Sequence, residues 1–384
     1  MSATNLTIRQ QERLQSQEFW TQHDVDIIQT DNFVGQEFFY PIYRYENFYS
    51  FSALNLIRHK GVFKPNPAAL QDLAAAHNDV SVPGCFIDAE IERVGGPPKL
   101  TGGIKDIAAY TKAMATAMQA DIAEAEANNP GYTNYILCGG RDSLNMLLAD
   151  WKNPTIVLSA APNFTLVQDF VAQNNLGYEV IELIDTPPDY GLEREIAEAC
   201  LQVNLEHWKW SAQLVALAQQ ADHKAIFWKG QFADSFLTDY WRSYTYRRGP
   251  VPAFLKRVWR RMARVLPDVL SYGPDQWFLA DYAASIWQRG AVGQGAHLGY
   301  LRALTGCLCL SCYHGPRTAK VWLDADLRIL AKQDLRPEIG ATLHGGPVRY
   351  PSENPAPDAS AFRAGHRTLE AYQAALRHMD IAVP

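Results

Sequence analysis

The chain has 384 residues, of which 47% are hydrophobic and 11% aromatic. This composition excludes general disorder, and the length favours two domains or one large domain with an appendage. A formal net charge of −6 and a sequence pI near 5.9 argue against a broad nucleic-acid-binding surface.

The N-terminal segment lacks an apolar signal region, and no stretch reaches the roughly 18 apolar residues that a membrane-spanning helix needs. The six cysteines are irregularly spaced and do not form the dense framework of a small secreted protein. We therefore expect a cytoplasmic protein with reduced thiols.

Two regions differ in their sequence pattern. Residues 1–104 combine a polar start, an aromatic stretch and Pro/Gly-rich segments, which predicts a small α+β N-terminal lobe. From Asp106 onward apolar residues recur every three or four positions, which indicates an amphipathic helix that ends at the turn residues 128–131. We assign residues 105–384 to a second domain.

Four short apolar runs follow this helix, with helical patterns between them. The runs cover residues 135–137, 155–158, 180–183 and 225–228. This alternation predicts an α/β fold, with a buried parallel sheet that carries helices on both faces and binds ligands where its strands end. Between the second and third runs, apolar residues from Phe164 to Val171 predict a helix that Gly177 terminates.

The C-terminal part is predicted to be mainly helical. Helical patterns cover residues 254–266 and 297–310, and a Pro/Gly-rich loop over residues 345–357 leads to a last helix over residues 362–379.

Four residues with metal-binding side chains lie close together in this part of the chain. They are Cys307, Cys309, Cys312 and His314, which could in principle bind zinc. Leu308 and Leu310 alternate with them, and a free cysteine is often buried as a small apolar side chain. A core helix or strand is therefore the preferred interpretation.

A glycine-rich loop, Cys138-Gly139-Gly140-Arg141-Asp142-Ser143, directly follows the first predicted strand and precedes a helical pattern. Consecutive glycines let the backbone turn with exposed N–H groups, and a helix N-terminus adds partial positive charge, so the layout suits pyrophosphate oxygens. A carboxylate beside phosphates needs a cation between them, which makes Asp142 a candidate Mg²⁺ ligand. Ser143 is a further hydrogen-bond donor.

A ligand-free explanation of this loop is a Gly-Gly turn that Asp142 closes as a helix N-cap. A second motif favours ligand binding. It follows the fourth predicted strand and reads Lys229-Gly230-Gln231-Phe232-Ala233-Asp234-Ser235, with Tyr240 shortly after. The ordered pair of motifs resembles the ATP pyrophosphatase family with its SGGxDS loop, in particular the synthetase domains of asparagine synthetase, β-lactam synthetase and carbapenam synthetase. The resemblance covers residues 105 to 350.

The resemblance implies a parallel-sheet ATP-pyrophosphatase domain, similar to the adenine nucleotide alpha hydrolases, with a helical C-terminal part. It implies that ATP contacts the loop, the end of the second strand and the start of the second motif. These residues are Cys138, Gly139, Gly140, Arg141, Asp142, Ser143, Leu158 and Gly230. It also implies that Asp142 and Asp234 share the Mg²⁺ ion.

Candidate catalytic residues follow from the same resemblance. Family members use a C-terminal Lys beside the adenylate, for which Lys320 and Lys332 are the nearest candidates, and Lys229 and Gln231 flank Gly230 in the second motif.

Glutamine hydrolysis is not expected. Position 2 is Ser2 rather than the nucleophilic Cys of the family's glutaminase domains, and residues 1–104 are too short for such a domain, of which they would be a reduced remnant.

The sequence thus predicts an ATP- and Mg²⁺-dependent ligase that forms AMP and pyrophosphate, adenylates a carboxylate and joins it to an amine as an amide or lactam. Its partners would be small-molecule acids and amines, free or carrier-bound. Nucleic acid is disfavoured, no membrane is expected, and homo-oligomerisation stays open.

Two alternatives remain. One is a non-catalytic relative that binds nucleotide or a partner protein, because Cys138, Gln231 and Ser235 replace the Ser, Glu and Glu of the family motifs. The other is an enzyme of the same superfamily that modifies RNA or a sugar, for which the basic segment 247–264 is the only indication.

Overall fold

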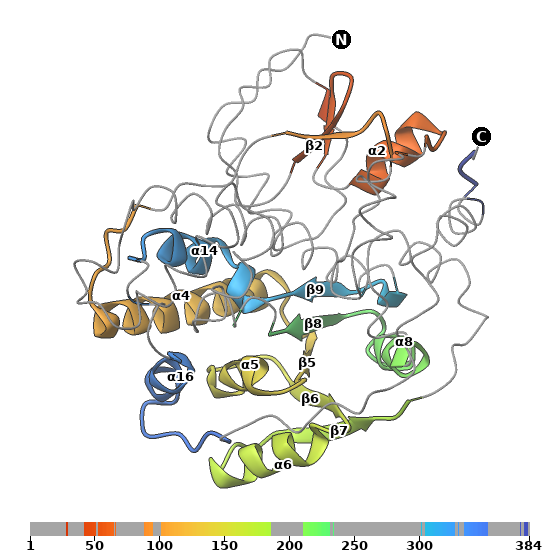
Figure 1. Ribbon diagram of the computed structural model, residues 1–384. Helices are drawn as coiled ribbons and strands as arrows, with labels where there is room; N and C mark the ends of the chain where they lie inside the picture. Colours follow the sequence, from red (N-terminus) through yellow and green to blue (C-terminus); the bar gives the residue numbers. More distant parts are fainter. Residues whose placement is uncertain are drawn as a thin grey trace, which may run out of the picture.

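The computed structural model describes parts of the N-terminal lobe and most of the parallel-sheet region (Figure 1). The described residues are 28–29, 42–50, 53–64, 66, 88–94, 101–185, 210–230, 233, 301, 304–326, 329, 334–351, 377 and 380–382. The expected helix over residues 254–266 and the basic segment 247–264 lie outside them, as does nearly all of the expected helix over residues 362–379.

The larger sheet has five parallel strands in the order β7-β6-β5-β8-β9. The strands are β5 (Thr133–Leu137), β6 (Thr155–Ala160), β7 (Glu179–Leu183), β8 (Ala225–Lys229) and β9 (Leu308–Leu310). This sheet confirms the α/β prediction and all four predicted strands. The fifth strand, β9, was not predicted as a strand of this sheet.

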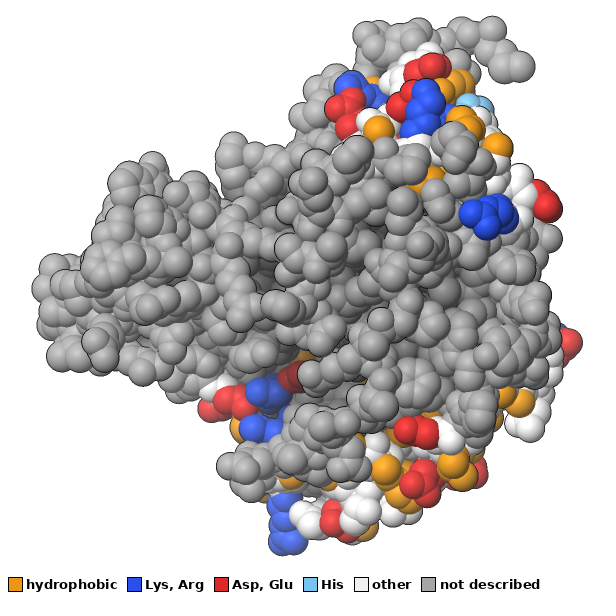
Figure 2. All heavy atoms as spheres, turned by 45° about the vertical axis from the view of Figure 1, so that its right-hand side comes forward, with side chains coloured by type: hydrophobic (Ala, Val, Ile, Leu, Met, Phe, Trp, Pro, Cys, Tyr) orange, Lys and Arg blue, Asp and Glu red, His pale blue; other side chains and the backbone are white. Residues whose placement is uncertain are grey.

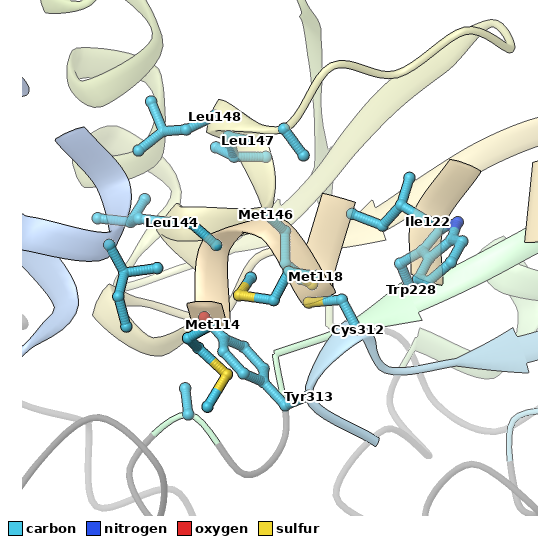
Figure 3. Packing of buried hydrophobic residues seen from close by; sticks show 14 of the residues in the cluster. Met114, Met118, Ile122, Leu144, Met146, Leu147, Leu148, Trp228, Cys312 and Tyr313 are labelled. Atoms are coloured by element: carbon cyan, nitrogen blue, oxygen red, sulfur yellow. The ribbon is translucent and has the colours of Figure 1, made fainter. Parts of the chain in front are cut away.

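Both faces of the sheet are buried at its central strands β5, β6 and β8, which explains why these strands are apolar runs rather than alternating sequences. In β8, Ile226 and Trp228 belong to one apolar cluster, whereas Ala225 and Phe227 belong to the cluster on the other face. Figure 3 shows part of the first cluster, where Met114 and Met118 meet Met146, Cys312 and Tyr313.

The helices divide between these two faces. The cluster that contains Trp228 includes residues of α4 (Ile107–Asn128), α6 (Phe164–Gln173), α14 (Pro316–Leu323) and α16 (Arg336–His344). The other cluster includes residues of α8 (Ser211–Gln220) (Figure 1). None of the helices in the described part of the chain is at once long and apolar enough to span a membrane.

The predicted helix from Asp106 is confirmed as α4, which Asp106 caps by accepting the N–H of Ala109 at 2.7 Å. The helix after the glycine-rich loop is also present but short. It consists of one α-helical turn, α5 (Arg141–Leu144), and one 3₁₀ turn, η2 (Asn145–Leu148).

The end of α6 corrects the prediction that Gly177 terminates this helix. The C-cap is Asn174, and Asn175 takes the left-handed conformation with φ of 52°. The N–H groups of Asn175 and Leu176 donate to the carbonyls of Ala172 and Val171 at 3.2 and 2.9 Å, which is the Schellman pattern. Asn adopts this conformation more readily than most non-glycine residues, so the helix ends before Gly177 is reached.

The predicted helix over residues 297–310 is wrong at its C-terminal end. Leu304 and Thr305 are helical, but Gly306 has φ of 64° and β9 follows directly. A short strand with apolar residues on both faces has no period of two that would distinguish it from a helix, so the sequence could not separate the two.

The cysteines of this region are core residues, as predicted. Cys307 and Cys309 belong to the cluster with α8, whereas Cys312 belongs to the cluster on the opposite face of the sheet. The thiols therefore do not converge on one metal ion. Among the described residues, which exclude the side chain of His314, no group of His, Cys, Asp and Glu has a metal-binding arrangement.

The described part of the N-terminal lobe has an antiparallel sheet of order β1-β3-β2-β4 and one helix. Its elements are β1 (Ile28–Gln29), β2 (Ile42–Tyr45), β3 (Phe48–Ser50), α2 (Ala53–Lys60) and β4 (Glu92–Val94). A buried ion pair joins Lys60 to Asp88 at 2.8 Å, and the N–H groups of Lys64 and Glu90 donate to the same carboxylate at 3.1 and 2.9 Å. These bonds satisfy a carboxylate that water cannot reach.

The last described residues of the chain pair with the segment that follows α2 in this lobe. The N–H of Phe63 donates to the carbonyl of Ala382 at 2.9 Å, and the N–H of Ala382 donates to the carbonyl of Gly61 at 3.2 Å. The C-terminal residues therefore extend the packing of the N-terminal segment.

A carboxylate on α4 caps the start of α14. Gly315, the N-cap residue, has no side chain, and Asp121 accepts the N–H and hydroxyl of Thr318 at 3.0 and 2.9 Å. Burial raises the pKa of Asp121, although these hydrogen bonds oppose the shift. A β-carbon on Gly315 would lie 1.9 Å from Oδ2 of Asp121, so only glycine fits this contact.

Gly315→Ala should therefore destabilise the protein by about 1–3 kcal/mol, because the new methyl group overpacks the α4–α14 contact. Urea denaturation followed by circular dichroism measures the change in the free energy of unfolding. Gly346→Ala is the matched control, since a β-carbon there meets no atom within 4 Å. Equal stability of the two variants would contradict the proposed contact.

Candidate functional site

The glycine-rich loop lies at the centre of the carboxyl edge of the parallel sheet. Leu137, the last residue of β5, is in register with Leu158 of β6 on one side and with Lys229 of β8 on the other. Because the strands are parallel and in register, the chain segments that follow them start at the same edge. Loop residues 138–143 and Gly230 are therefore neighbours, as the sequence predicted.

The first loop residue, Cys138, is held by β6 through its backbone. Its N–H donates to the carbonyl of Leu158 at 2.8 Å, and its carbonyl accepts the hydroxyl of Ser159 at 2.8 Å. Its side chain is buried in the cluster that contains Trp228. Gly140 has φ of 134° and ψ of −163°, a conformation that is essentially restricted to glycine, so the sharp turn depends on this residue.

The side chain of Ser143 stabilises the turn by hydrogen bonds within the loop. Its hydroxyl donates to the carbonyl of Gly140 at 3.1 Å and accepts the N–H of Gly139 at 3.1 Å. Ser143 is buried, so in this state its hydroxyl shapes the loop. To donate to pyrophosphate, as the sequence predicted, it would have to exchange a partner within the loop.

Asn163, which follows β6, supports the loop from the other side. Its Nδ2 donates to the carbonyl of Gly139 at 2.9 Å. Its Oδ1 is buried and has no hydrogen-bond partner among the described residues. An acceptor therefore lies beside the loop that a ligand donor can satisfy.

The end of β8 approaches the loop so closely that only glycine fits. A β-carbon on Gly230 would lie 2.7 Å from Cα and 2.7 Å from Cβ of Ser143. Backbone atoms cannot move aside as a flexible side chain can, so this contact fixes the distance between the two motifs. The loop and the first residues of the second motif are thus in direct contact at the sheet edge.

Two charged residues of the loop and two from the start of α16 form what we term the arginine–aspartate cluster: Arg141, Asp142, Asp334 and Arg336. Nη2 of Arg141 lies 2.8 Å from Oδ2 of Asp334, and Nε of Arg336 lies 2.8 Å from Oδ1 of Asp334. Nη1 of Arg336 forms an ion pair with Oδ1 of Asp142. The cluster joins the loop to the start of α16.

Exposure differs across this cluster. The Arg336 side chain is 14% exposed, whereas that of Asp142 is 44% exposed. Burial alone would lower the pKa of Arg336, but attraction to Asp142 and the hydrogen bond to Asp334 raise it above its ordinary value. Arg336 therefore remains charged, and Asp142 stays accessible to solvent.

Sequence reasoning missed several residues that shape this site. Asp334 and Arg336 come from the start of α16, and Tyr313, from the turn after β9, donates its hydroxyl to the backbone carbonyl of Asp142 at 3.3 Å. Asn163 could have been predicted from the sequence, because it is a polar residue close to the end of a predicted strand. The others are brought to the loop by tertiary packing.

The other predicted site residues that the structure describes lie either in buried positions or on an exposed helix surface. The Leu158 side chain lies in the core with α8, so the residue supports the loop through its backbone. Lys229 is buried at the end of β8, and Lys320 is exposed on α14. Gln231, Asp234 and Lys332 lie outside the described residues, so their roles stay predictions.

The described residues fit a pyrophosphate group and one divalent cation. A β-carbon on Gly139 would meet no atom within 4 Å, which leaves room for an anion against the backbone. Asp142 supplies a partly exposed carboxylate, and Mg²⁺ in nucleotide sites is commonly held by one or two carboxylates together with phosphate oxygens. Arg141 and Arg336 supply positive charge nearby.

No known family model matches the chain, and no curated protein matches it either.

Two glycine substitutions should separate folding from binding. Gly230→Ala should destabilise the protein by about 1–3 kcal/mol, because its methyl group collides with the backbone of Ser143. Gly139→Ala should leave the melting temperature nearly unchanged but weaken binding of magnesium pyrophosphate, since its methyl group fills the open space beside the loop. Thermal unfolding and calorimetry measure the two effects. Unchanged pyrophosphate affinity in Gly139→Ala would show that the anion does not bind there.

The buried thiols should be unreactive at neutral pH. Burial raises the pKa of Cys138 to about 11 and that of Cys307 to about 11, and the thiolate is the reactive form. Iodoacetamide at pH 8 should label these cysteines slowly in the folded protein and rapidly in denaturant, as peptide mapping by mass spectrometry will show. Equal labelling rates in both states would contradict the burial of these side chains.

Proposed function

We propose that the protein is an ATP-dependent ligase that activates a substrate carboxylate as its acyl-adenylate and transfers the acyl group to an amine. The main observation behind the proposal is the contact between Gly230 and Ser143, which brings the glycine-rich loop together with the start of a second glycine-containing motif from a distant part of the chain. The resemblance of both motifs to those of the asparagine synthetase-like ATP pyrophosphatases supports the same assignment.

The proposed reaction has two steps. A carboxylate oxygen forms a bond to the α-phosphorus of ATP, and the bond between that phosphorus and the bridging oxygen to the β-phosphate breaks, which releases pyrophosphate. The amine nitrogen then bonds to the acyl carbon, AMP leaves with the electron pair of the acyl–oxygen bond, and the amine loses a proton to solvent or a base. Mg²⁺, when bound, would neutralise charge on the pyrophosphate.

The residues of the chain would bind and orient the phosphates. The loop at Gly139 and Gly140 offers a fixed backbone that needs no rearrangement as charge moves onto the leaving group, which is the most effective form of electrostatic stabilisation. Asp142 would hold the metal together with Asp234, and Arg141 would add positive charge. Lys229, Gln231, Lys320 and Lys332 stay candidates for contacts with the reacting carboxylate.

Pyrophosphate release from ATP, measured with a panel of carboxylic acids and amines, tests the proposal. Wild-type protein should release pyrophosphate and AMP in equal amounts with its cognate acid and amine, and EDTA should abolish the release. Asp142→Ala and Asp234→Ala should each reduce the rate at least about 100-fold, because both remove a ligand of the catalytic metal. Lys152→Ala, at an exposed ion pair, is the control. Activity that survives both aspartate substitutions would refute the mechanism.

A non-catalytic nucleotide-binding protein is the second candidate. The observation in its favour is that Asp142, the proposed metal ligand, forms an ion pair with Arg336. Calorimetry with ATP and Mg²⁺ separates the two functions. Binding without pyrophosphate release across the whole panel would support the binding protein.

The alternative of RNA modification has less support. On the face seen in Figure 2, the described Lys and Arg side chains are interspersed with Asp and Glu side chains and do not gather into a basic area of their own. The basic segment 247–264 lies outside the described residues. Retention of the protein on immobilised RNA at moderate salt would favour this alternative over the ligase.

A further inference from the structure

The guanidinium group of Arg336 contacts two acidic residues through different nitrogen atoms. Its Nε donates to Asp334 at 2.8 Å, while its Nη1 pairs with Asp142. The backbone N–H of Arg336 also donates to Asp334, at 3.0 Å. The planar guanidinium has five donors in a fixed fork, so a change of the Nη1 partner does not require the Nε bond to Asp334 to break.

The position of Arg336 is set by packing rather than by Asp142. Arg336 begins α16, and this helix packs against α4 and η2. Gly340, on the next turn of α16, lies so close to Tyr350 and Leu148 that a β-carbon would be 1.9 Å from the tyrosine hydroxyl. The guanidinium is therefore held beside the loop on a rigid element.

The charges of the arginine–aspartate cluster cancel, with two arginines and two aspartates. A divalent cation on Asp142 would disturb this balance and repel Arg336, whereas an anion on the loop would restore it. Asp142 is the more exposed partner of the pair, so a cation can approach its carboxylate from solvent while Arg336 stays anchored to Asp334.

We propose that Arg336 is a pyrophosphate-binding residue whose Nη1, paired with Asp142 in this structure, exchanges that carboxylate for a phosphate oxygen when the metal and pyrophosphate bind. This inference rests on the proposed function, since it assumes that Asp142 and the loop hold a metal–pyrophosphate group. It adds a residue of α16 to the proposed site and gives the ion pair between Arg336 and Asp142 a role in ligand binding.

If this exchange occurs, replacement of Arg336 should change the affinities for the metal ion and for pyrophosphate in opposite directions. In Arg336→Gln, Mn²⁺ alone should bind about two- to tenfold more tightly, because Asp142 loses a competing positive charge. Inorganic pyrophosphate at saturating Mg²⁺ should bind about 10- to 100-fold more weakly, because a charged hydrogen bond to the anion is lost. A residue that only supported the fold would weaken both ligands when replaced.

The experiment combines Mn²⁺ titration followed by electron paramagnetic resonance with pyrophosphate calorimetry on full-length protein. Arg44→Gln is the matched control, because Arg44 pairs with Glu92 in the N-terminal sheet, and it should change neither affinity. Arg336→Lys keeps the charge but not the fork, so it should recover part of the pyrophosphate affinity. This second variant keeps the test decisive if Arg336→Gln folds poorly.

The outcomes separate this inference from the ligase proposal. Tighter Mn²⁺ binding together with weaker pyrophosphate binding supports the role of Arg336, even if no acid stimulates pyrophosphate release. In that case only the ligase function is refuted. The role of Arg336 is refuted if both Arg336 variants bind pyrophosphate as the wild type does, or if the affinities for Mn²⁺ and pyrophosphate fall together. Neither result would contradict a measured ligase activity. A wild-type protein that binds no pyrophosphate overturns both.

Discussion

The parallel pairing of β5 with β8 is the constraint on which the rest of the candidate site depends. It places the ends of two strands, far apart in the chain, at the same height on one edge of the sheet. The contact of Gly230 with Ser143 then sets their separation, because it involves the Cα, Cβ and backbone N of Ser143, which cannot move aside like the end of a flexible side chain. Once these strands are paired, the loop, the start of the second motif and Asn163 have little freedom in their relative positions.

The loop itself is shaped mainly by hydrogen bonds that it makes to the protein. β6 holds both backbone groups of Cys138, Ser143 bridges the two glycines, and Asn163 holds Gly139. A loop held by this many bonds within the protein would lose little conformational entropy on binding the proposed anion. The absence of a long helix after the loop makes this preorganisation more important than a helix dipole, since only two short turns follow.

Three carboxylates illustrate how burial changes the role of an acidic residue. Asp88 and Asp121 are fully buried and satisfied by several donors, and each ties together segments that are distant in sequence. Asp142 also pairs with an arginine, but nearly half of its side chain is exposed. A buried carboxylate with this many donors is locked in place, whereas a partly exposed one can exchange its partner at lower cost. The difference in exposure supports a ligand-binding role for Asp142 and structural roles for the others.

The sequence by itself determined the parallel sheet and the position of the glycine-rich loop. Apolar runs alternating with helical patterns specify buried parallel strands, and the paired glycines after β5 mark a sharp turn, in which Gly140 has a conformation that is essentially restricted to glycine. Only the tertiary structure decided that β9 is a strand, that the cysteines around it divide between two faces of the sheet, and that Asp334, Arg336 and Tyr313 surround Asp142. Local patterns report the conformation of neighbouring residues, whereas contacts between distant segments depend on how the elements pack, and no period within one segment records that packing.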